Sequence, residues 1–181
     1  GMPFGITLIA RADAERALLA FGAKWQRTVP LPLGKTASAL PPVDADPVVA
    51  EARVPIAVVG AHMSGLPLNA QLVELGGRFE RAARTAPLYR FYALPGGPPQ
   101  RPGMVRVDEG GGAIELEVWS LPADSVGTFL TKIPSPLGLG SVVLADGSAI
   151  PGFLCEAYAT KDARDITSLG GWRAYLGTLA V

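Results

Sequence analysis

The sequence predicts an α+β domain built around a mainly antiparallel sheet or small barrel, with helices on its flanks. Segments rich in β-branched and aromatic residues outnumber segments with helical periodicity, and most neighbouring strand candidates are separated by turns typical of hairpins. The length of 181 residues suits one domain with a full core and is too small for two sizeable ones. We therefore expect one main domain and a small appendage.

The expected appendage occupies residues 1–27. Residues 3–10 form a short apolar run that predicts a buried strand, and Asp13 is placed to cap a following helix. Apolar residues recur at helical spacing in that helix: Ala14, Leu18, Phe21 and Trp25. The sequence thus predicts a strand and a helix that form a small unit.

A linker is expected between this unit and the main domain. Residues 28–54 contain five prolines and no sustained hydrophobic period, which is typical of a semi-extended linker. We place the main domain at residues 55–181.

The main domain is expected to begin with a strand, a tight loop and a helix. A β-branched run leads to Gly60, and His62, the single histidine of the chain, follows two residues later. Residues 64–67 are expected to open a helix with apolar residues at Leu68, Leu72, Leu75 and Phe79, and Gly76–Gly77 is placed to end it. Because a helix start presents unpaired N–H groups and a partial positive charge, we expect a site for a carboxylate there, with His62 at its rim.

Two hairpins are predicted in the rest of the domain. Residues 85–94 predict an aromatic-rich strand, and residues 104–108 and 113–121 predict a hairpin with one wet face. Residues 141–145 and 148–157 flank Asp146–Gly147, which suits a two-residue hairpin turn.

Two short helices complete the expected elements. Residues 123–132 predict one, ended by the prolines of residues 133–138, and residues 172–176 predict a final turn of helix.

Composition excludes several classes of function. The 16 basic and 16 acidic residues balance, so no field of one sign indicates nucleic acid or an anionic membrane surface as partner. Cys155 is the single cysteine, which excludes an intrachain disulfide, and one histidine does not provide a zinc site, so we expect no metal and no cofactor. No apolar run approaches the ~18 residues of a membrane span, and the expected location is cytoplasmic.

Several segments, in the same order, resemble the C-terminal domain of allophanate hydrolase. They are residues 59–69, 84–94, 152–156, 165–167 and 170–176, and residues 3–10 resemble the last strand of the amidase domain that precedes it. The resemblance implies a fold similar to γ-glutamyl cyclotransferases, a mixed β-barrel with flanking helices. It also implies decarboxylation of N-carboxycarbamate, which the amidase makes from allophanate during the use of urea.

Two related activities are not expected in this chain. A cyclotransferase needs an acidic residue shortly after the strand that resembles residues 115–121, and residues 133–138 contain no carboxylate. The serine nucleophile and lysine of the amidase belong to a region that has no match here, so no Ser-Ser-Lys amidase activity is expected.

His62 is the candidate catalytic residue. An imidazole donates or accepts a proton near neutral pH, and protonation assists the loss of CO2 from a dianionic substrate. Gly60, Ala61, Ser64 and Gly65 are candidates for backbone or hydroxyl contacts to a carboxylate; the structural alternative is a turn and helix cap, and the two roles are compatible.

The other candidates have structural alternatives too. Asn69 either lines the pocket or bonds the loop, and Tyr89 is either a pocket residue or a core aromatic. The opposite wall of the pocket is expected to include Ser135, Pro136 and Leu137.

Two hypotheses stay open. The first is that the domain is a decarboxylase acting on a small dianionic carboxylate. The second is that it is a non-catalytic module that forms a homodimer or docks onto an amidase. Catalysis and docking can also both be true. A cyclotransferase-like enzyme is a weaker third hypothesis.

Overall fold

The computed structural model describes residues 6–10, 14–28 and 51–179, and the chain divides into two compact units, residues 1–48 and 49–181. In the smaller unit, residues 6–10 have no regular secondary structure and are followed by helix α1 (Glu15–Thr28). The strand predicted at 3–10 is therefore not formed over its described part, because a strand requires hydrogen bonds from a neighbour and the described residues of this unit provide none. Asp13 and most of the predicted linker lie outside the described residues.

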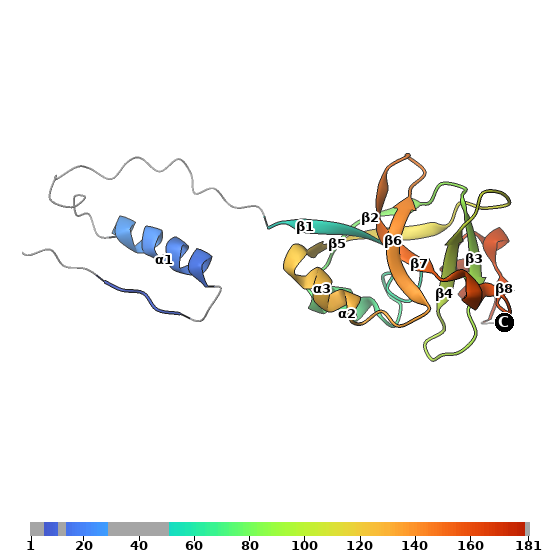
Figure 1. Cartoon of the computed structure of the whole chain (residues 1–181), viewed down its shortest axis with the longest axis horizontal. Coiled ribbons are helices and arrows are strands. Elements are labelled where there is room, and N and C mark those ends of the chain that lie inside the picture. Colours follow the sequence, from blue (N-terminus) through green and yellow to red (C-terminus); the bar gives the residue numbers. More distant parts are fainter. Residues whose placement is uncertain (1–5, 11–13, 29–50, 180–181) are drawn as a thin grey trace, which may run out of the picture. The chain divides into compact units, whose positions relative to one another are not determined.

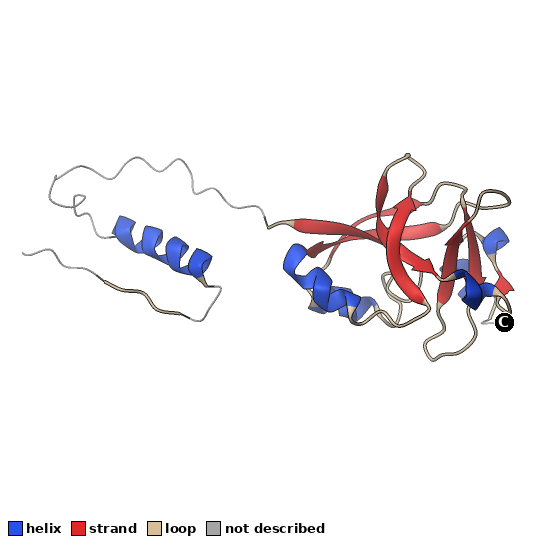
Figure 2. Ribbon diagram, in the orientation of Figure 1, coloured by secondary structure: helices blue, strands red, loops and turns tan. Residues whose placement is uncertain are grey.

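The larger unit combines strands with short helices (Figures 1 and 2). The strands are β1 (Arg53–Val58), β2 (Arg78–Arg84), β3 (Tyr89–Ala93), β4 (Pro102–Arg106), β5 (Glu115–Pro122), β6 (Leu137–Val143), β7 (Ala149–Cys155) and β8 (Arg164–Asp165). The α-helices are α2 (Asn69–Glu74), α3 (Val126–Leu130) and α4 (Trp172–Gly177), and the 3-10 turns are η2 (Ala123–Ser125), η3 (Ala157–Thr160) and η4 (Thr167–Leu169).

The strands form two sheets and do not close into one barrel. Five strands are ordered β2-β5-β1-β7-β6, and three are ordered β4-β3-β8. Every strand pair is antiparallel except β1 with β7, which is parallel. The predicted α+β class with a mainly antiparallel sheet is confirmed.

The middle of the larger sheet supplies much of the core. β1 is paired on both edges, and its residues Ile56, Ala57 and Val58 are fully buried. This explains the continuous apolar run in its sequence, which is typical of a strand covered on both faces.

The hairpin predicted between residues 104–108 and 113–121 is wrong. β4 pairs with β3 in the smaller sheet, whereas β5 pairs with β1 and β2 in the larger one. Seven of the eight residues of β5 are buried, so both of its faces are covered and the expected wet face is absent from this strand. Its charged residue Glu117 is inside the protein, at 5% exposure.

Helix α2 is shorter than predicted at both ends. It begins at Asn69 instead of residues 64–67 and ends at Glu74. Gly76 has φ of +76°, and the Gly77 N–H donates to the Leu72 carbonyl at 2.8 Å, so the two glycines do end the helix. Phe79 belongs to β2, a strand that was not predicted because Phe79 continues the helical spacing of Leu68, Leu72 and Leu75.

The predicted hairpin about Asp146–Gly147 is confirmed. β6 and β7 pair in antiparallel register from Leu137 with Cys155 to Val143 with Ala149. Gly147 has φ of +83°, which the tight turn requires. The short helices predicted at 123–132 and 172–176 are present as η2 with α3 and as α4.

Candidate functional site

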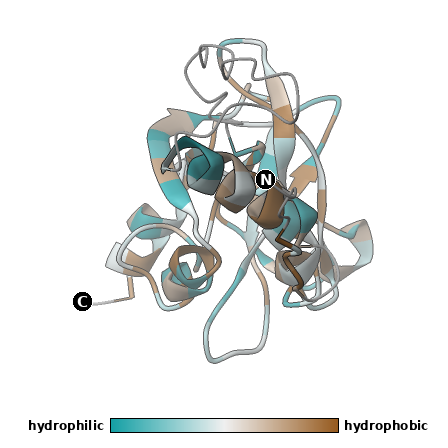
Figure 3. Ribbon diagram, turned by 90° about the vertical axis from the view of Figure 1, so that its left-hand side faces the viewer, coloured by the Kyte–Doolittle hydropathy of each residue, from teal (hydrophilic) through white to brown (hydrophobic). Residues whose placement is uncertain are grey.

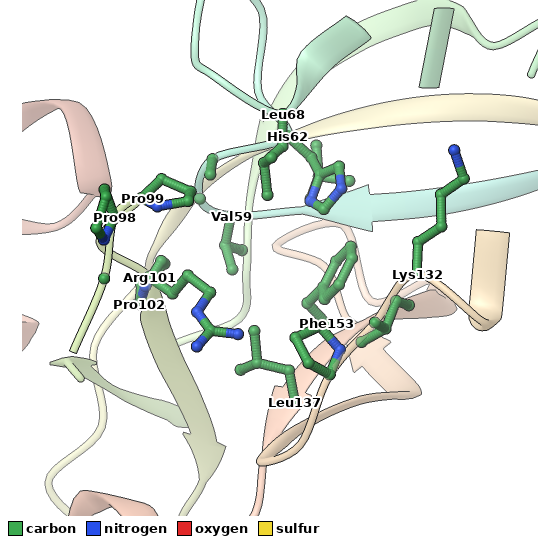
Figure 4. Close-up of a pocket in the computed structure, with 16 residues that line it drawn as sticks. Val59, His62, Leu68, Pro98, Pro99, Arg101, Pro102, Lys132, Leu137 and Phe153 are labelled. Atoms are coloured by element: carbon green, nitrogen blue, oxygen red, sulfur yellow. The ribbon is translucent and has the colours of Figure 1, made fainter. Parts of the chain in front are cut away.

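A cavity of about 400 Å³ lies at the end of β1. Its lining residues come from the end of β1 and the following turn, from two proline-containing segments that lead into β4 (97–102) and β6 (132–137), and from Phe153 of β7 (Figure 4). Apolar and proline side chains form most of its surface, and three nitrogen-bearing side chains stand among them: His62, Arg101 and Lys132.

The turn after β1 is fixed by hydrogen bonds. The Met63 N–H donates to the Gly60 carbonyl at 2.9 Å, which closes a four-residue turn with Ala61 and His62 at its centre. A turn of this kind uses the N–H of its fourth residue, and no described residue accepts a hydrogen bond from the N–H of Ala61 or His62. Two backbone donors are thus available in residues that line the cavity.

Gly60 is required by close packing. A Cβ atom at this position would lie 2.5 Å from the Cδ and Cγ atoms of Pro102. The absence of a side chain therefore allows the end of β1 to approach β4, and this contact joins two walls of the cavity.

His62 is held between aromatic rings on the inside of the turn. It is 9% exposed, stacks on Phe153 with ring centroids 5.1 Å apart, and meets the edge of Phe129 at 5.3 Å. Its Nε2 lies 3.0 Å from Oε1 of Gln71 on α2. Because a carbonyl oxygen only accepts, Nε2 carries the hydrogen in this arrangement and Nδ1 is the basic nitrogen.

Burial lowers the pKa of His62 below the ordinary value of 6.5, and the hydrogen bond with Gln71 opposes this only in part. The ring is therefore mainly neutral at pH 7 in the free protein. At pH 7 it becomes mainly protonated only when something in the cavity favours the charged form.

Arg101 and Lys132 give the cavity a positive charge. Within the described part of the chain, neither the guanidinium nor the ammonium group forms a hydrogen bond or ion pair, and none of the lining residues is acidic. Arg101 extends into the cavity toward Leu137 and Phe153, whereas the exposed Lys132 stands on the side of His62 (Figure 4). Such an arrangement suits a small anion.

Four of the predicted site residues line the cavity together: Gly60, Ala61, His62 and Leu137. Asn69 bonds the loop, because its Nδ2 donates to the His62 carbonyl at 2.9 Å. Tyr89 is fully buried, and its hydroxyl oxygen accepts from the Val143 N–H at 2.8 Å.

The remaining candidates lie outside the cavity lining. The Ser64 N–H and hydroxyl both donate to Oε2 of Glu117, at 2.8 and 2.9 Å, so an internal carboxylate occupies them. Gly65 is next to Ser64, and the Ser135 hydroxyl lies 3.3 Å from that of Tyr158. Ser135 and Pro136 precede the lining residue Leu137.

Arg101 and Lys132 are the site residues that the sequence did not reveal. Arg101 follows a cluster of prolines and glycines and belongs to no periodic pattern or motif. Lys132 ends a short helical segment, where a solvent-exposed lysine is ordinary. Only the folded arrangement brings these cations into the cavity that His62 lines.

The described residues give no sign of a metal site or a membrane span. They contain no group of three His, Cys, Asp or Glu side chains that could hold a metal ion, and none of their helices is long and apolar enough to cross a membrane. Cys155 is buried, which raises the pKa of its thiol.

Comparisons with known proteins agree with the resemblance. The chain is 39% identical to the urea amidolyase of Saccharomyces cerevisiae over 196 aligned positions, which cover 99% of this chain and 10% of that protein. The urea amidolyase of Lachancea kluyveri is 37% identical over the same shares. The chain thus spans about one tenth of the length of the curated relatives it matches.

Solved structures give the same result. The allophanate hydrolase of Kluyveromyces lactis superimposes with a TM-score of 0.68 and 40% identity, over 71% of this chain and 22% of that one. The protein c4763, specific to uropathogenic E. coli, has a TM-score of 0.66 and 40% identity, and 97% of its chain is covered by 70% of this one. The family model described as "Allophanate hydrolase C-terminal domain" matches residues 54–177. The chain belongs to the family of allophanate hydrolase C-terminal domains.

Proposed function

We propose that the domain decarboxylates N-carboxycarbamate, downstream of allophanate hydrolysis in urea degradation, with His62 as general acid. The proposal rests on the side chains that line the cavity of this domain, together with its membership of the family. The single histidine of the chain lines this cavity together with two cations that have no partner among the described residues, and none of the described lining residues carries a carboxylate. A dianion of two carboxylates on one nitrogen has the charge that this lining favours.

The reaction needs one proton. N-carboxycarbamate, a dianion with an NH between two carboxylates, takes up one proton on nitrogen as the C–N bond breaks, and the electron pair of that bond goes to nitrogen. The products are CO2 and the carbamate anion, whose nitrogen has become an amino group. The protein therefore has to hold two negative charges and deliver one proton at the nitrogen.

Arg101 is assigned to the retained carboxylate. Its guanidinium has a fork of donors that matches a carboxylate, and it extends into the cavity without a partner among the described residues. The N–H groups of Ala61 and His62, which have no acceptor among the described residues, are further donors for the substrate. The departing carboxylate becomes neutral CO2, which the apolar surface near Phe153 accommodates.

His62 acquires its proton when the substrate binds. The free ring is neutral because burial lowers its pKa. A dianion a few ångströms away favours the imidazolium and raises the pKa, so the substrate itself supplies the condition for general acid catalysis. After proton transfer to the leaving nitrogen, the ring is neutral and no longer attracts the carbamate anion by charge.

The test is a coupled assay of CO2 release. An amidase domain and allophanate generate N-carboxycarbamate in solution, and CO2 is measured with no added domain, with the wild-type chain and with His62→Gln. General acid catalysis contributes about 10²–10⁴-fold, so the wild type should accelerate CO2 release and His62→Gln should lose at least about 100-fold of that acceleration. If the wild-type chain does not increase the rate of CO2 release above that with the amidase alone, the proposal is refuted.

A second candidate function rests on the smaller unit. Hydrophobic and hydrophilic residues both occur along α1 (Figure 3), and Ile9, Leu19 and Phe21 are 89%, 73% and 56% exposed. A segment with these side chains in water favours burial against a partner, and an amidase domain is the partner that the family suggests. Light scattering of the chain with and without an amidase domain tests this, and a monomer that ignores the amidase would count against docking and dimerisation together.

A further inference from the structure

A second polar cluster lies behind the His62 turn and has no part in the proposed reaction. Glu117 of β5, at 5% exposure, accepts hydrogen bonds on Oε2 from the Ser64 N–H, the Ser64 hydroxyl and the Trp119 indole. Its Oε1 accepts from Nη2 of Arg173 at 2.7 Å. Four donors thus converge on one buried carboxylate.

Arg173 connects the same turn to the last helix. Its Nη2 also donates to the Ser64 carbonyl at 2.9 Å, and its Nη1 lies 3.5 Å from the Met63 sulfur. Ser64 is therefore held at its N–H, its hydroxyl and its carbonyl by two residues that are distant in sequence. The turn that carries His62 is tied to β5 and to α4.

We propose that Glu117 and Arg173 are positioning residues for His62, which act through Ser64 to fix the turn and thereby the place of the imidazole in the cavity. Only Met63 separates His62 from Ser64 in the chain, and the hydrogen bond from the Met63 N–H to the Gly60 carbonyl closes the turn around His62. A carboxylate is suited to this task because it accepts all four hydrogen bonds without bringing a donor of its own. The catalytic consequence rests on the proposed function, whereas the positional one does not.

The single histidine makes the positional consequence measurable. In a chain labelled with ¹⁵N-histidine, every imidazole signal belongs to His62, so its tautomer and titration are read without assignment. The variants are Glu117→Gln, which keeps the shape but puts an amide where one carboxylate oxygen was, and Ser64→Ala, which removes one of the turn's bonds to Glu117.

Thr85→Val provides a matched control. Thr85 is fully buried, and its hydroxyl oxygen accepts from the Ile114 N–H at 3.0 Å, so the variant loses a buried hydrogen bond that has no link to the turn. It therefore reports what mere destabilisation does to the His62 signals.

We expect Glu117→Gln to shift the ¹⁵N imidazole signals and the midpoint of titration of His62, Ser64→Ala to shift them less, and Thr85→Val to leave them unchanged. In the CO2 assay, Glu117→Gln should lower kcat roughly 10- to 100-fold with KM within about twofold, because misplacement of the acid affects the transition state more than binding. His62 signals identical to wild type in a folded Glu117→Gln variant would overturn the proposal. Failure of the CO2 assay in the wild type would instead reject the proposed function and leave the positional result standing.

Discussion

The two sides of the turn from Gly60 to Leu68 differ in how their charges are balanced. On the cavity side, Arg101 and Lys132 have no partner among the described residues. On the opposite side, Arg173 and Glu117 are joined to each other at 2.7 Å and to the backbone of the turn. A paired cluster gives a fixed structure, whereas an unpaired cluster is open to a ligand, and the single histidine lies on the unpaired side.

Breaking the paired side should have the largest effect on stability. Glu117→Leu leaves the Ser64 N–H, the Trp119 indole and part of Arg173 without an acceptor, and we expect a loss of about 3 kcal/mol in the free energy of unfolding. Urea denaturation followed by circular dichroism measures it.

Glu115→Leu is the control on the same strand. Glu115 also pairs with Arg173, at 3.3 Å, but it is 39% exposed, so its removal should cost less than about 1 kcal/mol. Equal losses for the two variants would contradict the distinction between a buried anchor and a surface ion pair.

Removing the inner cation of the unpaired side should affect binding and spare stability. Arg101→Met loses charged hydrogen bonds to a bound carboxylate, so malonate, a stable dicarboxylate analogue, should bind roughly 10- to 100-fold more weakly by calorimetry. Arg106→Met, at the exposed end of β4 and outside the cavity lining, removes the same charge and should change affinity less than about twofold. Parallel losses in both variants would indicate a general charge effect.

The outer cation should matter less. Lys132 is exposed, so Lys132→Met should weaken malonate binding only about two- to fivefold, and this loss should disappear in high salt. An effect of Lys132→Met as large as that of Arg101→Met would place the substrate nearer the rim than we propose.

The pH dependence of unfolding should separate His62 from Glu117. The pKa of His62 is lowered by burial, so the unfolded chain binds the proton more tightly and stability falls as pH drops below 6.5. Burial alone raises the pKa of Glu117, but the hydrogen bonds it accepts, led by that from Trp119, hold it below 4.5, and its contribution is lost only at lower pH. His62→Gln should flatten the curve just below pH 6.5 and leave the more acidic decline; a curve unchanged in both windows would contradict the assignment.

Local patterns predicted those parts of the fold that depend on neighbours in sequence. The Asp146–Gly147 hairpin and the helix end at Gly76 are encoded by turn chemistry within a few residues. The pairing of β5 with β1 and β2 depends on contacts between distant segments, and alternation of charge in residues 115–121 suggested a solvent face because Glu117 and its distant partner Arg173 cannot be matched from sequence.

In the site, too, features set by neighbouring residues were predictable, and features set by contacts between distant segments were not. His62 was identifiable because it is the single histidine and follows a strand, whereas Arg101 joins the same cavity only because Pro102 packs against Gly60. The helix start expected at 64–67 is absent because turns extend to Leu68, and Ser64 meets an internal carboxylate in place of a substrate. Periodicity detects no tertiary contact of this kind.

Whether a bound dianion causes protonation of His62 is measured by titrating His62 by ¹⁵N NMR in the free protein and with saturating malonate. We expect a pKa below 6.5 in the free protein and a rise of this pKa on binding, because the dianion favours the imidazolium beside it. If the pKa of His62 stays unchanged or falls when malonate binds, substrate binding does not protonate His62, and the proposed role of His62 as general acid is contradicted.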